Sequence, residues 1–214
     1  MLNKFLKYSL PFSILVLLMA FIRPVSANVS LVVFGDSLSA GYGISQADTW
    51  VAEIERRWQR AYPEFRIINA SISGDTTQGG LNRLQDVVSQ HQPDVVFIEL
   101  GGNDGLRGFQ VDTIRANLSA MIELLQAQGI HVALSQVDIP PNMGRRYTSE
   151  FSALFADVAK HYDVTLVPFF MLEIAPDSQL MQTDGIHPNL AAQPLIADIM
   201  EPQLRRILQQ VKQP

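Results

Sequence analysis

Nucleophilic catalysis by a serine needs a serine, a histidine and an aspartate, and three residues of this chain have the types and the spacing for it. Ser37 lies in the sequence Gly-Asp-Ser-Leu-Ser, and Asp184 precedes His187 by three residues in Asp-Gly-Ile-His-Pro. A serine hydroxyl attacks a carbonyl efficiently only when a base removes its proton, and an imidazole serves as that base when a carboxylate sets its tautomer. A spacing of three can place the carboxylate and the imidazole on one side of a turn. These residues therefore predict acyl transfer through a serine nucleophile.

Acyl transfer also needs hydrogen-bond donors for the negative charge that develops on the carbonyl oxygen. Two further polar loops could supply them, since Gly74 lies in Ser-Gly-Asp-Thr-Thr and Asn103 lies in Gly-Gly-Asn-Asp-Gly. We expect the backbone N–H groups of Ser37 and Gly74 and the side-chain amide of Asn103 to form an oxyanion hole. Taken singly, each of these residues is more simply explained as a turn former. Their combination is what favours catalysis.

Short apolar runs alternate with amphipathic segments after residue 27, and this order decides where the polar loops lie. Five apolar runs are typical of buried strands: residues 29–34, 65–70, 95–100, 131–136 and 165–169. Five amphipathic segments are typical of helices: residues 49–61, 79–90, 111–128, 148–161 and 189–211. The alternation predicts a single α/β domain with a parallel sheet and right-handed crossovers. Because ligands bind beyond the carboxyl ends of such strands, we expect the polar loops to converge at one edge.

Composition excludes several other classes of protein. The 214 residues are 47% hydrophobic and 17% charged, which fits a folded domain and not a disordered chain. The chain has no cysteine, which removes disulfides, thiolate metal sites and a cysteine nucleophile. The formal net charge of −5 provides no basic field that would attract nucleic acid.

Residues 1–27 have the features of a secretory signal peptide. Two lysines precede an apolar run over residues 10–22, and a Val-Ser-Ala sequence with small residues where a signal peptidase binds ends at Ala27. The rival interpretation is an uncleaved membrane anchor, but the apolar run is shorter than the roughly 20 residues that span a bilayer. We expect cleavage after Ala27, which leaves an exported domain over residues 28–214 without a stable membrane anchor.

The polar loops, in their order along the chain, resemble the four sequence blocks of the SGNH subgroup of the GDSL hydrolases. The blocks are Gly-Asp-Ser-Leu-Ser at residues 35–39, Gly74 in its loop, Gly-Asn-Asp at residues 102–104 and Asp-Gly-Ile-His-Pro at residues 184–188. Longer stretches fit one member group, the periplasmic multifunctional thioesterases, lysophospholipases and arylesterases of Gram-negative bacteria. They lie at residues 69–76, 99–110, 142–147 and 168–171. The resemblance covers essentially all of the chain after residue 27.

This resemblance implies a three-layer, flavodoxin-like fold, in which a five-stranded parallel sheet of order 2-1-3-4-5 lies between helices. It implies that Ser37 is the nucleophile, His187 the base and Asp184 its partner, with Ser37, Gly74 and Asn103 in the oxyanion hole. The expected activity is hydrolysis of acyl esters and thioesters, including lysophospholipids and aryl esters, through an acyl-enzyme on Ser37. No cofactor or metal is implied. We expect a periplasmic or secreted monomer that acts on small molecules and binds no nucleic acid.

An acyl chain would need an apolar groove beside Ser37. Three segments are candidate walls: residues 105–109, 139–147 and 169–174. The last segment reads Phe-Phe-Met-Leu-Glu-Ile, which is unusually apolar for a loop and is equally well explained as part of the core under the last helix.

Other functions stay open on the residues alone. A carbohydrate deacetylase would use the same three catalytic residues with a short, polar acyl pocket. A binding domain of the same architecture would need none of them. The remaining histidines, His91, His131 and His161, lie in or beside expected helices and strands and are interpreted as structural. With only one histidine at the polar edge, a two-metal hydrolase is disfavoured.

Overall fold

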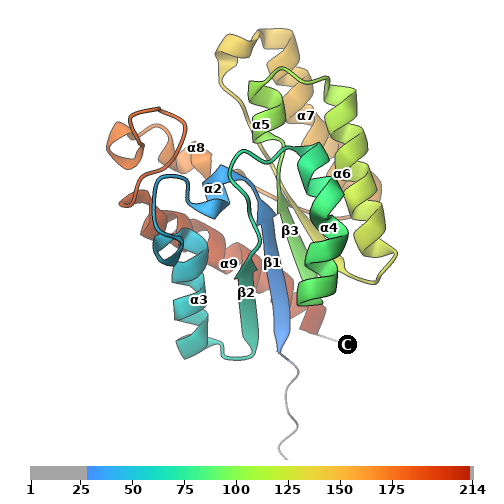
Figure 1. The fold of residues 1–214 in the computed structure, drawn as a ribbon, viewed down its shortest axis with the longest axis vertical. Coiled ribbons are helices and arrows are strands. Elements are labelled where there is room, and N and C mark those ends of the chain that lie inside the picture. Colours follow the sequence, from blue (N-terminus) through green and yellow to red (C-terminus); the bar gives the residue numbers. More distant parts are fainter. Residues whose placement is uncertain (1–27, 213–214) are drawn as a thin grey trace, which may run out of the picture.

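The computed structural model of the protein describes residues 28–212, and Figure 1 shows their fold. The signal peptide expected over residues 1–27 lies outside the described residues, so its cleavage stays a prediction. Within the described range, no helix combines the length and the apolar character needed to cross a membrane.

A five-stranded sheet of order β2-β1-β3-β4-β5 forms the centre of the fold, and every pairing in it is parallel. The strands are β1 Val29–Gly35, β2 Phe65–Asn69, β3 Val95–Glu99, β4 His131–Ser135 and β5 Thr165–Val167. Strands β1 and β3 are buried along their whole length, because helices cover both faces of the sheet. The expected fold class and strand order are confirmed, and the strand ends lie within two residues of the expected positions.

Five long helices form the two outer layers of the fold (Figure 1). They are α3 Trp50–Ala61, α4 Thr77–His91, α6 Val111–Gln126, α7 Arg145–Tyr162 and α9 Ala192–Lys212. Helices α3 and α9 contact each other on one face, where α3 also packs on β2 and α9 on β1. On the other face α6 lies between α4 and α7, and α6 and α7 both contact β4. All five were expected, with ends displaced by up to three residues.

Helix α3 illustrates how local sequence produces these elements. Trp50, Ile54 and Trp58 recur at every fourth position and are fully or almost fully buried on one stripe of the helix. The side chain of Thr49 accepts a hydrogen bond from the backbone N–H of Ala52 and so caps the first turn. The apolar stripe and the cap together explain both where α3 begins and which face it turns to the sheet.

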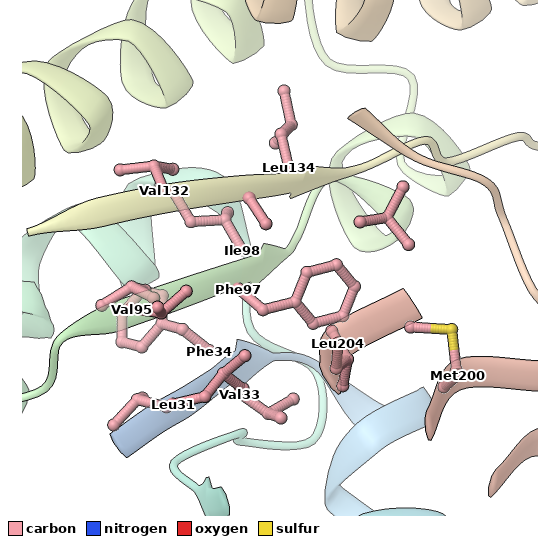
Figure 2. Packing of buried hydrophobic residues seen from close by; sticks show 14 of the residues in the cluster. Leu31, Val33, Phe34, Val95, Phe97, Ile98, Val132, Leu134, Met200 and Leu204 are labelled. Atoms are coloured by element: carbon pink, nitrogen blue, oxygen red, sulfur yellow. The ribbon is translucent and has the colours of Figure 1, made fainter. Parts of the chain in front are cut away.

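The core makes the sheet a stiff platform for the loops at its edge. Figure 2 shows side chains of β1, β3 and β4 packed against one another and against Met200 and Leu204 of α9. Both α9 residues are completely buried, as are Phe34 and Phe97 on the central strands. Close packing of this kind resists displacement, so the carboxyl ends of the strands hold fixed positions relative to one another.

Three short helices at the carboxyl edge of the sheet were not expected. They are α2 Ser37–Ala40, α5 Gly102–Leu106 and α8 Met171–Ile174. Three 3-10 turns, Gln46–Asp48, Pro141–Met143 and Ser178–Leu180, were also missed. Segments of three to five residues are too short to display a helical period in sequence. Two of these helices matter for the site, because α2 begins at Ser37 and the first turn of α5 contains Asn103.

Candidate active site

The structure brings the three residues expected to carry nucleophilic catalysis into one chain of hydrogen bonds. Ser37, at the first position of α2 after strand β1, places its Oγ 2.9 Å from Nε2 of His187. The other ring nitrogen, Nδ1, lies 2.7 Å from Oδ2 of Asp184. In the tautomer protonated at Nδ1, the imidazole donates to the carboxylate and accepts from the serine hydroxyl. This is the order of contacts that proton removal from Ser37 requires.

A tight turn holds the carboxylate beside the imidazole. The second oxygen of Asp184, Oδ1, accepts hydrogen bonds from the backbone N–H groups of Ile186, at 2.9 Å, and His187, at 3.0 Å. Gly185 allows the turn because its φ is +67°, in the left-handed region that favours glycine. The backbone N–H of His187, followed by its side chain, lowers the pKa of the Asp184 carboxyl to about 2. Asp184 is therefore ionised throughout the neutral range.

Tyr42 packs against the imidazole and was not among the expected site residues. Its ring centroid lies 4.4 Å from that of His187, with the two planes tilted by 34°. The side-chain amide of Gln182 donates to the backbone carbonyls of Tyr42, at 2.7 Å, and Pro188, at 3.1 Å. One glutamine thus ties the loop after α2 to the loop that carries the histidine. Nothing in the local sequence of Tyr42 or Gln182 indicates this contact.

The three expected oxyanion donors follow three neighbouring strands of the sheet. Ser37 follows β1, Gly74 lies in the loop after β2, and Asn103 follows β3. The N–H groups of Ser37 and Gly74 donate to no other residue in the described part of the chain. Gly74 has a φ of +80°, and a Cβ built on it would meet nothing within 4 Å, so open space adjoins this backbone. Both N–H groups are thus available to a ligand oxygen.

A buried network connects the start of α4, which follows the loop with Gly74, to α5, which contains Asn103. The carboxylate of Asp104, which follows Asn103, accepts from the backbone N–H of Thr77 at 2.9 Å and from its hydroxyl at 2.6 Å. The amide of Asn117 on α6 donates to the same hydroxyl at 3.0 Å. Burial raises the pKa of the Asp104 carboxyl, and its bonds to Thr77 act against that rise. The network sets the positions of Gly74 and Asn103 relative to each other.

Arg83 on α4 holds the loop that contains Gly74. Its guanidinium pairs with the carboxylate of Asp75 at 2.7 Å and donates to the backbone carbonyl of Ala70 at 2.6 Å. The guanidinium carbon lies 3.9 Å from the centroid of the Phe34 ring, so the guanidinium also makes a cation–π contact with this ring. Sequence reasoning missed Arg83, because its partners lie on other elements.

Two carboxyl groups lie buried at the carboxyl ends of β1 and β3. Glu99, at the end of β3, accepts from the hydroxyl of Ser39 at 2.7 Å, and burial raises its pKa well above the usual range. Burial also raises the pKa of the Asp36 carboxyl, to about 6. A Cβ built on Gly35 would lie 2.5 Å from Oε2 of Glu99, so a larger residue would have to displace this buried carboxyl. Glu99 falls within the apolar run 95–100 that was expected to be a buried strand, whereas the local sequence did not indicate that Asp36 is buried.

An apolar groove of about 350 Å³ begins beside the turn that carries His187. All three segments expected as walls line it, through side chains that include Leu106, Ile139 and Leu172. Ile186, the neighbour of His187, completes the wall on the catalytic side. The segment 169–174 belongs to the groove and to the core at once, because Phe170 and Ile174 are buried whereas Leu172 is 60% exposed.

The other three histidines lie away from this site. His91 ends α4, His131 begins β4 and His161 lies in the last turn of α7. All three positions are at the amino edge of the sheet, since the helices run back from the carboxyl edge. Among residues 28–212, no group of three or more His, Cys, Asp or Glu side chains is arranged to hold a metal ion.

Comparison with known proteins places this geometry in a family. The model of the GDSL-like Lipase/Acylhydrolase family matches residues 33–194. Thioesterase 1/protease 1/lysophospholipase L1 of Escherichia coli K12 is 46% identical over 206 residues, which are 96% of this chain and 96% of that protein. An arylesterase of Vibrio mimicus is 43% identical over 178 residues, 83% of this chain and 89% of that protein.

A solved structure agrees with these sequence matches. The psychrotrophic esterase EstA of a Pseudoalteromonas species, crystallised with monoethylphosphonate as inhibitor, matches with a TM-score of 0.82 and 42% identity. The match covers 84% of this chain and 98% of that one. On the strength of a family match over most of its length and of relatives above 40% identity, the chain belongs to the GDSL-like lipase/acylhydrolase family of ester hydrolases.

Proposed function

We propose that this protein is a serine esterase and acyl-thioesterase with Ser37 as nucleophile, His187 as general base and Asp184 as the partner that orients the base. The observation that carries the proposal is the continuous contact from Ser37 Oγ through both ring nitrogens of His187 to Asp184, at 2.9 and 2.7 Å. These distances allow proton transfer without movement of any of the three side chains.

The reaction proceeds in two steps. Nε2 of His187 takes the proton of the Ser37 hydroxyl while Oγ forms a bond to the carbonyl carbon of the substrate. The tetrahedral intermediate then expels the alcohol or thiol, which takes its proton from His187, and an acyl-enzyme remains on Ser37. Water, deprotonated by His187 in the same way, adds to the acyl carbon. The bond to Oγ breaks, the free acid leaves, and Ser37 recovers its proton.

Negative charge on the carbonyl oxygen is stabilised in both steps by the oxyanion hole. The donors are the backbone N–H groups of Ser37 and Gly74 and the side-chain amide of Asn103. The first two have no partner among the described residues, which supports this role. Donors that are in place before the reaction stabilise the charge without a rearrangement of the protein.

The acyl chain of the substrate lies in the groove beside His187. Apolar side chains dominate its walls, among them Leu106, Ile139 and Leu172. Each buried methylene contributes about 0.8 kcal/mol, so kcat/KM rises by up to about fourfold for each carbon until the groove is full. A carbohydrate deacetylase would need a short, polar pocket at this place. The groove therefore favours medium and long acyl chains over acetyl groups.

The printed activities of the relatives suggest the range of leaving groups. One relative is named as a thioesterase and lysophospholipase and another as an arylesterase. We infer that this enzyme accepts thiol, aryl alcohol and lysophospholipid leaving groups on the same acyl-enzyme. The features of residues 1–27 support export to the periplasm or beyond. A single chain carries every residue of the proposed site, which supports the proposal of a monomeric enzyme.

Covalent labelling tests the nucleophile directly. A serine-directed fluorophosphonate should modify the wild-type enzyme at Ser37, located by mass spectrometry of the labelled peptide. The Ser37→Ala variant should take up no label and lose about 10³- to 10⁶-fold in kcat on p-nitrophenyl butyrate. Ser89→Ala, on the exposed side of α4, is the matched control and should behave as wild type. A Ser37→Ala enzyme with near-normal kcat would refute the assignment.

A further inference from the structure

The amide of Asn103 has a charged partner that the mechanism above does not use. Its Nδ2 donates to Oδ2 of Asp36 at 3.1 Å. Oδ1 of the same carboxylate accepts from the backbone N–H of Leu38, also at 3.1 Å, and caps α2. Asp36 is only 2% exposed. One buried carboxylate therefore contacts both the helix that begins with Ser37 and the side chain expected to bind the oxyanion.

Capping α2 does not by itself explain a carboxylate at this position. Serine, asparagine and aspartate are about equally good N-caps, and the first two carry no charge. A buried charge costs free energy unless it is paired or hydrogen-bonded. The cost is increased here, because the negative charge of Asp75 opposes the ionised form of Asp36 and adds to the effect of burial in raising its pKa. A neutral cap would avoid this penalty, so the charge of Asp36 has a further use.

We propose that Asp36 is a positioning residue of the oxyanion hole, whose carboxylate holds the amide of Asn103 by one N–H and leaves the other N–H for the reacting carbonyl oxygen. The proposal rests on the role of Asn103 in the proposed function. A carboxylate only accepts hydrogen bonds, so it selects the nitrogen end of the amide. If the amide turned over, its oxygen would face the carboxylate and that bond would be lost. Asp36 thus orients the amide of Asn103 by a hydrogen bond, as Asp184 orients the imidazole of His187.

A charged acceptor makes this selection strong. Hydrogen bonds to an ionised acceptor are roughly twice as strong as those between neutral groups. Burial of Asp36 excludes the water that would otherwise compete for its carboxylate. The charged groups that act on Asp36 are His187, which favours its ionised form, and Asp75, which opposes it. An effect of Asp36 on catalysis could thus pass through Asn103 or through His187, and the experiment must separate the two routes.

A double-mutant cycle separates them. Asp36→Ser keeps a capping oxygen for Leu38 but is too short to reach Asn103. We expect it to lower kcat on p-nitrophenyl butyrate about 10- to 100-fold, by analogy with the loss of hydrogen-bond partners that orient metal ligands. KM should stay within about twofold of wild type, because the contact acts on the transition state. In an Asn103→Ala background the same substitution should lower kcat by less than about twofold.

The control is a second aspartate of similar structural role at the other end of the sheet. Asp94 accepts hydrogen bonds from the backbone N–H of Ser30 at 2.7 Å and from its hydroxyl at 3.1 Å. Asp94→Ser should lower the melting temperature and leave kcat unchanged. It shows what the loss of a structural carboxylate does when no site residue is involved. Should Asp36→Ser fail to fold, Asp36→Asn takes its place in the cycle, since its single acceptor can serve Leu38 or Asn103 but not both.

Each outcome has one meaning. Equal losses from Asp36→Ser in both backgrounds would overturn the proposal, because the effect would then pass through His187 or through the fold. Unchanged kcat in Asp36→Ser would overturn it too. If Asn103→Ala alone kept wild-type kcat, the oxyanion role in the proposed function would fail first, and the inference with it. A loss in Asp36→Ser that disappears in the Asn103→Ala background supports both.

Discussion

Replacing Asp184 by asparagine changes one atom of the site and should nearly abolish catalysis. The structure shows why, because the two oxygens of Asp184 have different partners. Oδ1 accepts from the backbone N–H groups of Ile186 and His187, and Oδ2 faces Nδ1 of the imidazole. In Asp184→Asn the amide oxygen keeps the two backbone donors, so the amide nitrogen faces Nδ1. Nδ1 must then accept, the proton moves to Nε2, and Nε2 can no longer take the proton of Ser37.

The size of the effect follows from these contacts. Turning the asparagine amide over would restore the productive tautomer but lose two backbone hydrogen bonds, each worth about 1 kcal/mol. That difference of about 2 kcal/mol leaves at most about 3% of molecules in the productive arrangement, a loss of about 30-fold in kcat. The lost carboxylate also stabilised the imidazolium that forms in the transition state. Together the two effects should approach the loss of about 10⁴ found for this substitution in serine proteases, or about 5 kcal/mol in activation free energy.

The assay is kcat on p-nitrophenyl butyrate at pH 8, with the melting temperature of each variant measured alongside. Asp177→Asn is the matched control, because Asp177 also accepts from a backbone N–H in its own turn, that of Gln179 at 2.9 Å, and faces no imidazole. It should keep wild-type kcat. An Asp184→Asn enzyme that keeps more than about a tenth of kcat would refute the tautomer argument, since the structure allows about 3%.

The same substitution should alter the acid stability of the fold. The folded-state pKa of Asp184, about 2, lies below the ordinary aspartate value of 3.8. The ionised carboxylate therefore adds stability above pH 4, and that contribution is lost as the pH falls through 2. Asp184→Asn should remove this part of the pH dependence of the melting temperature while leaving the slope above pH 4 unchanged. An unaltered profile between pH 4 and pH 2 would contradict the assigned contacts.

Two further predictions concern the groove and the floor of the site. Leu172→Asp should reduce kcat/KM for p-nitrophenyl octanoate by at least about tenfold, because it removes apolar surface that a longer acyl chain contacts. The kcat/KM for the acetyl ester should stay unchanged, because the acetyl group is too short to reach this surface. The control Leu124→Asp, at an exposed leucine of α6, should leave kcat/KM for both esters unchanged. Gly35→Ala should lower the free energy of unfolding in urea by about 1–3 kcal/mol, since its Cβ would lie 2.5 Å from the buried carboxyl of Glu99. Equal losses on both esters, or an unchanged urea midpoint, would contradict the respective arguments.

The contacts of the site explain why so many separate loops can act together. Gln182 links the histidine loop to the loop after α2, Asp104 links the loop after β3 to α4, and Arg83 holds the loop after β2. Each link joins segments that are distant in the chain but adjacent at the edge of the sheet. A catalytic geometry with tolerances well below 1 Å needs such supports, because loops held only at their ends would move too far.

Features that depend on neighbours in the chain could be read from the sequence. The stripe of Trp50, Ile54 and Trp58 and the cap at Thr49 are local, and the structure has both. The three-residue spacing from Asp184 to His187 is also local, and it closes the turn that joins their side chains. The apolar strand runs implied one parallel sheet, which the structure confirms.

Tertiary structure alone decided how residues far apart in the chain meet. Ser37 and His187 are 150 positions apart in the chain. The sequence predicted only that both lie in loops at one edge of the sheet, and the structure alone shows that Oγ and Nε2 lie within hydrogen-bond distance. The pairing of Asp36 with Asn103 left no trace in local sequence, because any loop of this composition accommodates an exposed carboxylate. The periodicity of a sequence indicates which face of a helix or strand is apolar. The strength of a contact and the charge state of its groups depend instead on the partner residue and on the exclusion of water, and these are determined only when the chain folds.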